Sequence, residues 1–204
     1  MQISNLTYRS SMSYSCNVYL LQGDRNAPQG NNTLVDVGND PSVIDRIAGM
    51  PIGVGKRAIE QVVLTHSHSD HTGILELVRG KFKPMVYACS GSLAPDVLLQ
   101  DGQKLICGDQ EFQVLCTPGH SEDSICLYCP SDGTLFAGDT PVVIRADGSY
   151  EDWFVQVLER LSRKEIRTIY FGHGSSLHKN AQAVLAESLK NVMAAKTHAG
   201  RLLR

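Results

Sequence analysis

The segment LTHSHSDHTG at residues 64–73 constrains the fold of this chain more than any other stretch of its sequence. It overlaps the end of a continuous apolar run, IEQVVLTH at 59–66, which predicts a strand buried on both faces. The residues at 71–80 predict a helix that ends at Gly80. Four side chains able to bind a metal therefore fall at one strand-to-helix junction: His66, His68, Asp70 and His71.

The spacing of these four residues favours two neighbouring metal positions. Residues two apart on an extended segment share a face, so His66 and His68 can hold one ion. The chain then turns, and Asp70 and His71 can face a second ion. Imidazole nitrogen and carboxylate oxygen suit zinc, and also iron or manganese. Because the segment also carries serine and threonine, we do not expect all four side chains to be ordinary core residues.

Three more residues of ligand type follow predicted strands, and each lies next to a glycine. They are His120 in VLCTPGHS, Asp139 in TLFAGDT and His173 in IYFGHG. Glycine lets the backbone turn sharply out of a strand and approach an ion closely. With the first four residues they make five histidines and two aspartates, which is enough for two metals if one carboxylate bridges them.

The rest of the chain predicts further strands and helices, separated by turn signals at short intervals. Strands are expected near 2–8, 16–23, 32–38, 84–88, 103–107, 111–117, 124–129, 134–138 and 167–172. One helix is expected at 41–49 and another from about 177 onward. Between them, a capping box formed by Ser149 and Asp152 predicts the beginning of a third helix. Strand clusters covered by amphipathic helices favour two packed sheets with helices outside, an α/β sandwich forming one domain over residues 1–204.

Charge and composition narrow the classes of partner. The 204 residues carry 19 Lys and Arg against 21 Asp and Glu, a formal net charge of −2, which disfavours nucleic acid. No apolar stretch approaches the roughly 20 residues of a membrane span, so no membrane partner is expected. The N-terminal residues lack the pattern of a signal peptide, and we expect a cytoplasmic protein with a small-molecule substrate.

Six cysteines are expected to be structural thiols rather than ligands or disulfides. Cys126 and Cys129 form a CxxC pattern, but they lie on a predicted strand. Residues three apart on a strand point to opposite faces, which is poor geometry for one metal.

These motifs resemble those of the metallo-β-lactamase superfamily, from the DVG at 36–38 to the GHG at 172–174. The resemblance implies a four-layer αββα sandwich with a dinuclear site at one edge of the sheets. It also implies that Asp36, in LVDVG, supports the site without binding metal. The implied ligands are His66, His68 and His120 for the first metal, Asp70, His71 and His173 for the second, and Asp139 as the bridge.

Differences among branches of the superfamily narrow the resemblance. Enzymes that hydrolyse β-lactams commonly have Cys or a non-ligand residue at the position of Asp139, so this chain looks more like the glyoxalase II, lactonase and nuclease branches. Flavodiiron proteins carry Glu at the position of His68, so this chain does not resemble that branch. Glyoxalase II has a helical C-terminal domain that contributes to glutathione binding, whereas about thirty residues follow His173 here. We therefore do not expect glutathione to be recognised by that route.

The resemblance and the ligand set predict hydrolysis of a small ester-like bond by a hydroxide that bridges two divalent metals, most simply Zn²⁺. Asp70 and Asp139 are the expected catalytic residues, with Asp70 relaying the proton to the leaving group. A thioester is the expected substrate, and a lactone or a β-lactam-type substrate is the alternative. A mononuclear iron oxygenase like the persulfide dioxygenases and a non-enzymatic binding protein are the rival functions on the same scaffold.

Several residues outside the cluster can be interpreted either as functional or as ordinary structural residues. Arg145 either reaches an anionic substrate or is an ordinary surface arginine. Tyr150 and Trp153 either wall the pocket or pack at the start of a helix and in the core. The loop DRNAPQGNN at 24–32 is a candidate lid over the site. Separately, His178 and His198 are expected on the surface of the terminal helix, and the sequence predicts no oligomeric state.

Overall fold

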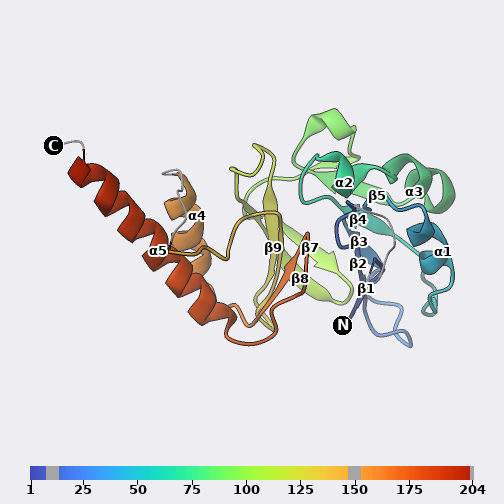
Figure 1. Ribbon diagram of the computed structural model, residues 1–204. Coiled ribbons are helices and arrows are strands. Elements are labelled where there is room, and N and C mark those ends of the chain that lie inside the picture. The colour runs from blue at the N-terminus through green and yellow to red at the C-terminus, as the bar shows by residue number, and fades with distance from the viewer. Residues whose placement is uncertain (8–13, 147–152, 203–204) are drawn as a thin grey trace.

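The first of two β-sheets in the computed structural model holds the strand that leads into the histidine-rich segment (Figure 1). The structure describes residues 1–7, 14–146 and 153–202. The first three strands of this sheet are antiparallel, and the third to the sixth run parallel. Its strands, in spatial order, are β1 (Gln2–Asn5), β2 (Tyr19–Gln22), β3 (Thr33–Val35), β4 (Gln61–Val63), β5 (Met85–Ala88) and β6 (Val97–Leu98).

The second sheet packs face to face against the first and is antiparallel except for one pair. Its spatial order is β11 (Thr168–Phe171), β10 (Thr134–Gly138), β9 (Ile125–Cys129), β8 (Gln110–Cys116) and β7 (Lys104–Cys107). The pair β10 and β11 runs parallel, with a register shift between Phe136 and Gly138. This irregularity lies directly before Asp139, one of the predicted site residues.

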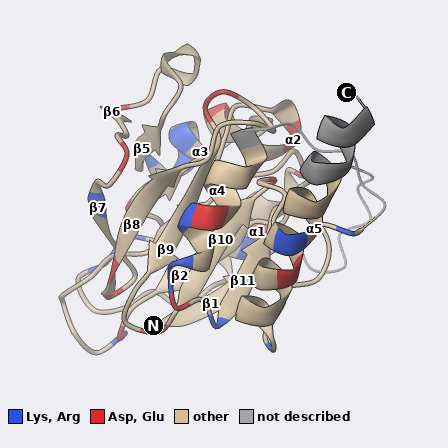
Figure 2. Ribbon diagram, turned by 90° about the vertical axis from the view of Figure 1, so that its left-hand side faces the viewer, with Lys and Arg blue, Asp and Glu red and all other residues tan. Residues whose placement is uncertain are grey.

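Helices cover the outer face of each sheet. In Figure 1, α1 (Ser42–Ala48), α2 (Ser69–Thr72) and α3 (Leu75–Phe82) lie on the side of the first sheet. On the opposite side, α4 (Trp153–Ser162) and α5 (Ala181–Leu202) lie beside the second sheet, and Figure 2 shows both in front of it. A short 3₁₀ helix, η1 (Gly91–Leu93), lies between β5 and β6.

Three clusters of buried apolar side chains fill the spaces between these four layers. Side chains alternate between the faces of a strand. Along β3, Leu34 therefore packs under the helices of the first sheet, while Val35 packs between the sheets. Along β10, Leu135 packs under α4 and α5, and Phe136 packs between the sheets. Burial on both faces explains the continuous apolar runs in the sequence, and the predicted αββα sandwich is confirmed.

The helix predicted at 71–80 is two helices instead of one. Ile74 leaves the helical conformation between α2 and α3, because its backbone N–H bonds to the carbonyl of Gly38 at 3.1 Å. The predicted end at Gly80 is also wrong, since α3 continues to Phe82 and ends at Lys83 in a left-handed conformation (φ 49°). The break at Ile74 arises from a tertiary contact, and the extension beyond residue 80 arises because the helix tolerates Gly80. Local sequence patterns reveal neither.

The loop at 24–32 is not a lid over the site. It joins the end of β2 to the beginning of β3, so it lies at the opposite end of the sheet from the residues that follow β3 and β4. There the Asp24 N–H bonds to Asp109 Oδ2 at 3.0 Å, and the Asn31 N–H bonds to the Gly108 carbonyl at 2.7 Å. These contacts dock the loop on the turn between β7 and β8.

All six cysteines are free thiols in the structure, and that none of them binds a metal stays a prediction. Cys126 packs under the helices of the second sheet, and Cys129 packs between the sheets, so the two point to opposite faces of β9. Within residues 1–7, 14–146 and 153–202, none of the helices has the length and apolar character that a membrane span requires.

Some sequence predictions are wrong or fall outside the described residues. His178 is not on the terminal helix, since α5 begins at Ala181, after Asn180 in a left-handed conformation (φ 60°). The predicted capping box and Tyr150 lie outside the described residues, as do the side chains of Trp153 and His198.

Candidate metal centre

The carboxyl ends of strands from both sheets meet at one edge of the sandwich and bring the predicted ligands together. The turn after β4 supplies four of them, and the segments after β8, β10 and β11 supply the others. All seven predicted residues lie in two adjoining groups: His66, His68 and His120, and then Asp70, His71, Asp139 and His173. The structure therefore places every predicted site residue at this edge, while their role as metal ligands stays a prediction.

The first group consists of three histidines from two sheets. One ring nitrogen of each lies within 4.8 Å of the others. His66 is buried, whereas His68 and His120 are exposed at the edge of the sheets. Nε2 of His120 lies 2.9 Å from Nδ1 of His68. Three imidazole nitrogens converging from one side are a donor set that suits zinc.

The second group combines two carboxylates and two imidazoles. Nε2 of His173 lies 3.0 Å from Oδ2 of Asp70, and Nε2 of His71 lies 3.8 Å from the same oxygen. His71 is fully buried, and Asp70 is nearly so. This mixed donor set differs from the all-histidine first group in charge as well as in position.

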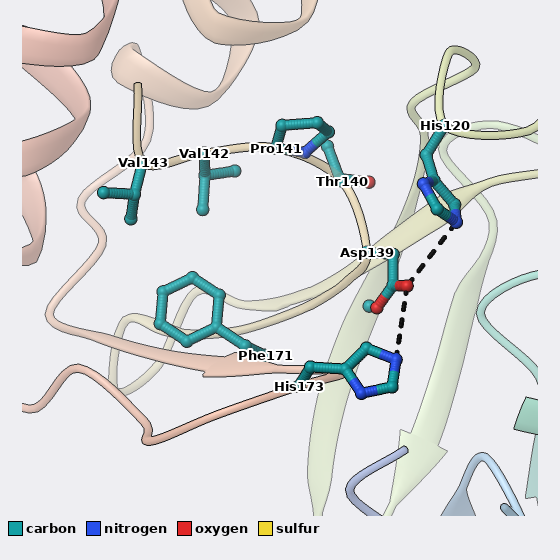
Figure 3. A pocket seen from close by; sticks show the side chains of 9 residues that line it. His120, Asp139, Thr140, Pro141, Val142, Val143, Phe171 and His173 are labelled. Carbon is teal, nitrogen blue, oxygen red and sulfur yellow. Dashed lines mark ion pairs between the residues drawn. The ribbon is translucent and has the colours of Figure 1, made fainter. Parts of the chain in front are cut away.

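Asp139 lies between the two groups. Its Oδ2 is 3.5 Å from Nε2 of His120 in the first group and 3.5 Å from Nε2 of His173 in the second, as the dashed lines of Figure 3 show. Its Oδ1 is 3.3 Å from Nε2 of His71. A single carboxylate within reach of both groups has the position that the sequence predicts for a bridging ligand.

A buried network behind the site fixes which nitrogens face the cluster. Asp36 accepts hydrogen bonds from the Thr65 N–H and the Thr65 hydroxyl, both at 2.8 Å. Its Oδ2 also lies 2.8 Å from Nδ1 of His71, and Thr65 Oγ1 lies 3.1 Å from Nδ1 of His66. If each Nδ1 donates in these contacts, the Nε2 lone pairs of His66 and His71 point into the site. In this tautomer the Nε2 atom of each ring is free to bind a metal.

The buried Nε2 atoms test whether the site fits a cation. Nε2 of His66 is buried without a hydrogen-bond partner. The buried Nε2 of His71 makes no hydrogen bond of good geometry either, although Oδ1 of Asp139 lies 3.3 Å from it. Buried polar atoms without good partners are rare, and cations at the two ligand groups would satisfy these nitrogens. The residues present therefore fit a divalent metal, and the mixture of imidazole and carboxylate suits zinc, iron or manganese.

The pKa values reflect the competition between burial and the carboxylates. Burial, with the charge of His71, lowers the pKa of His66 to about 4, so this ring is neutral near pH 7. Burial also opposes the charged form of His71, but the charge of Asp36 and hydrogen bonds to Asp139 and Asp36 outweigh it and raise the pKa of His71. The pKa of Asp139 falls, because the contacts with His71 overcome the opposing effect of burial. The carboxylates around His71 therefore favour a positive charge at this position.

Two glycines make room for this arrangement. A Cβ on Gly172 would clash with Oδ1 of Asp139 and lie 2.7 Å from Cε1 of His71. Gly138 has a left-handed conformation (φ 52°), and a Cβ there would lie 2.8 Å from the Thr65 side chain. The glycines noted beside Asp139 and His173 therefore allow backbone and side chains from two sheets to approach closely.

Sequence reasoning missed two residues that contact the cluster. Thr65 bonds to Asp36 and contacts both buried histidines, yet a β-branched residue at a strand end carries no signal beyond strand formation. Cys16 is fully buried beside Asp36 and His71, and burial raises the pKa of its thiol to about 12. Nothing in the sequence around Cys16 links it to residues 36 or 71. Arg145, the candidate contact for an anionic substrate, is exposed.

Four layers with a histidine–aspartate cluster at one edge define an α/β-sandwich protein with a candidate divalent-metal site. The sequence matches the metallo-β-lactamase superfamily over residues 13–95 and 90–173, and the chain belongs to this superfamily.

Curated relatives match part of the chain. A hydroxyacylglutathione hydrolase of Francisella tularensis subsp. tularensis is 34% identical over 92 residues, which are 44% of this chain and 36% of that protein. A hydroxyacylglutathione hydrolase of Idiomarina loihiensis is 39% identical over 90 residues, which are 41% of this chain and 33% of that protein. The matched segment thus spans about a third of the length of these relatives.

Solved structures share the fold over most of the chain. A metallo-β-lactamase family protein from Thermus thermophilus superposes with a TM-score of 0.69 at 20% identity, covering 94% of this chain and 79% of that one. The BLEG-1 B3 metallo-β-lactamase gives a TM-score of 0.67 at 23% identity, covering 86% and 93%. At these identities the likeness concerns the fold.

Proposed function

We propose that this chain is a glyoxalase II-like metallohydrolase that holds two zinc ions and cleaves a small thioester. The observation that carries the proposal is the pair of ligand groups with Asp139 between them. His66, His68 and His120 would hold the first ion, and Asp70, His71 and His173 the second, with Asp139 shared. Two divalent ions at such a site supply a hydroxide nucleophile near neutral pH and polarise a carbonyl group.

The residues of the chain have distinct tasks in this proposal. Asp36 holds the His71 ring through Nδ1, so that Nε2 stays directed into the site. Asp70 Oδ2, which faces His173, would accept the proton that the attacking water loses as it becomes hydroxide, and would return it to the leaving thiolate to give the free thiol. Asp139 keeps the two groups at a fixed separation, since its carboxylate reaches histidines of both.

The relatives support a thioester over the other ester-like substrates. Both are named hydroxyacylglutathione hydrolases and are at least 34% identical to this chain in the matched segment. We propose that this chain cleaves the same class of bond as these relatives, a thioester, and we do not propose that it acts on the same thiol. The net charge of −2 disfavours binding to nucleic acid, so we propose a small molecule as the substrate. We also propose that the protein is located in the cytoplasm.

The test is an activity panel on protein whose metal content is known. Zinc-loaded protein should contain two equivalents of metal by elemental analysis and release free thiol from simple thioesters. Lactones and a β-lactam serve as alternative substrates on the same preparation. Turnover of lactones or β-lactams alone would replace the thioester assignment, and inactivity of two-zinc protein on the whole panel would refute the hydrolase. Oxygen uptake by iron-loaded protein with a persulfide would favour an oxygenase.

A further inference from the structure

A cavity of about 270 Å³ opens beside the candidate metal centre (Figure 3). One side of it is formed by His120, Asp139 and His173, which are residues of both ligand groups. A group attached to a scissile bond at the centre can therefore extend directly into this space. The chemistry of the remaining wall determines which groups it accepts.

The wall away from the histidines is apolar. Pro141, Val142 and Val143 come from the segment after Asp139, and Phe171 comes from the end of β11. The hydroxyl of Thr140, which also lines the cavity, is already paired with that of Thr117 at 2.7 Å. This side of the cavity therefore presents hydrocarbon and no free hydrogen-bonding side chain among its described residues.

Val143 is the residue of this wall with most surface left for a ligand. It is 55% exposed, whereas its neighbour Val142 is 1% exposed and packs under the helices. Burial of an exposed valine by a ligand is favourable at about 25 cal/mol per Å² of apolar surface. An exposed apolar side chain next to a polar cluster is thus a natural contact for an apolar part of the substrate.

The charge of the apolar wall also favours an uncharged group. None of the described residues that line the cavity is Lys or Arg, and Arg145 is exposed and not among them. A carboxylate that lay against Val143 and Phe171 would therefore have no basic side chain of this wall to pair with. An apolar, uncharged substituent suits this wall better than a charged one.

We infer that this cavity selects thioesters with an apolar, uncharged substituent, and that Val143 and Phe171 form the contact surface for it. The inference rests on the proposed thioester hydrolase and deepens it by assigning the substrate class. The substituent is either the acyl chain or the thiol portion, because both are attached to the scissile bond, and the experiment separates the two.

The experiment compares two series of substrates on protein loaded with two zinc ions. In the first, the thiol is N-acetylcysteamine and the acyl group is acetyl, butyryl or hexanoyl. In the second, the acyl group is acetyl and the thiol is methanethiol, propanethiol or hexanethiol. A well-packed methylene changes kcat/KM by about tenfold or more, so we expect at least about a tenfold rise along one series. The series that rises identifies which portion occupies the cavity.

Variants of exposed valines provide the matched comparison. Val143→Asp places a charge on the apolar wall and should reduce the preference for the longest substituent by about tenfold or more. Val54→Asp changes a valine that is 65% exposed, outside the cavity, and should leave the preference unchanged. Val143→Ser is the milder variant, expected to lower the preference without adding charge. Metal content of each variant should remain two equivalents.

A binding measurement gives a readout that needs no turnover. The hexyl thioether of N-acetylcysteamine cannot be hydrolysed and should bind at least about tenfold more tightly than the methyl thioether, with a negative heat-capacity change. Activity on thioesters that is flat along both series, with equal thioether affinities, would overturn this inference and leave the proposed function standing. Absence of turnover on every thioester would instead overturn the proposed function.

Discussion

At the scale of the residue, buried side chains behind the seven ligand-type residues hold the candidate metal centre in place. Asp36 is 2% exposed and takes a left-handed conformation (φ 58°), which places its carboxylate against Thr65 and His71. Left-handed backbone is costly for most residues and less so for Asp and Asn. The network thus uses a tolerated backbone conformation to orient the buried imidazole.

Asp36→Asn tests this orienting role. Asparagine keeps the size and tolerates the left-handed conformation, but it removes the negative charge that holds His71. We expect metal affinity to fall about 10- to 100-fold, the usual effect of losing the hydrogen-bond partner of a ligand histidine. Competition with a chromophoric chelator measures the affinity. Asp109→Asn, at the opposite end of the sheets, is the control, and equal affinities of both variants would contradict the role of Asp36.

Asp70→Ala tests the assignment of the second ion. Removal of this carboxylate takes away a predicted ligand of the second group and leaves the three histidines of the first intact. We expect one metal per chain by elemental analysis instead of two, with catalytic turnover reduced by at least about 100-fold. Glu122→Ala removes an exposed carboxylate near His120 in the sequence and should retain two metals. Two metals retained in Asp70→Ala would refute the ligand assignment.

At the scale of the element, strand ends and their glycines determine how closely the two sheets converge. Strand β10 ends in Gly138 and Gly172 directly follows β11, and the lack of side chains on these glycines leaves space for Thr65, Asp139 and His71. The register shift before Gly138 turns Asp139 toward the other sheet. Backbone geometry at these strand ends, rather than side-chain identity alone, forms the site.

Gly172→Ala should therefore prevent metal binding at the site, whereas Gly80→Ala should not. The added methyl group would clash with Asp139 and His71, so we expect loss of bound metal and at least about 100-fold lower turnover. Gly80→Ala adds a methyl group inside α3, where nothing lies within 4 Å. It should keep two metals and raise the free energy of unfolding by about 0.5–1 kcal/mol, measured in urea. Normal metal content in Gly172→Ala would show that the close approach is unimportant.

At the scale of the whole molecule, the candidate metal centre joins the two halves of the sandwich. Four of the seven ligand-type residues follow a strand of the first sheet, and three follow strands of the second. Each half otherwise has its own apolar cluster under its helices, and the third cluster lies between the sheets. Cations at the shared edge would therefore stabilise the folded arrangement of both sheets.

Metal removal should lower thermal stability. A ligand present at 100 times its dissociation constant stabilises the folded state by about 2.7 kcal/mol. For a chain of this length that corresponds to a change in Tm of roughly 5–10 °C. Calorimetry before and after EDTA treatment, followed by zinc addition after removal of the chelator, measures the loss and its recovery. An unchanged Tm on metal removal would mean that the cations do not link the two sheets.

The sequence by itself determined the layer order and which residues of ligand type gather at the candidate metal centre. Continuous apolar strands must be buried on both faces, and amphipathic helices must be buried on one. A layered sandwich with helices outside the sheets satisfies both requirements. The cluster His66-x-His68-x-Asp70-His71 was equally readable, because its chemistry depends on residue types at short spacing. Local patterns of this kind are visible without knowing which distant segments meet.

Tertiary structure alone decided the features that depend on distant segments. The contacts of Thr65 and Cys16 with Asp36, and the apolar wall that Val143 shares with Phe171, join residues far apart in the chain. The loop at 24–32 was a candidate lid until strand direction placed it at the opposite end of the sheet. Strand direction and sheet convergence arise from packing of the whole chain, and packing is not encoded in any short segment.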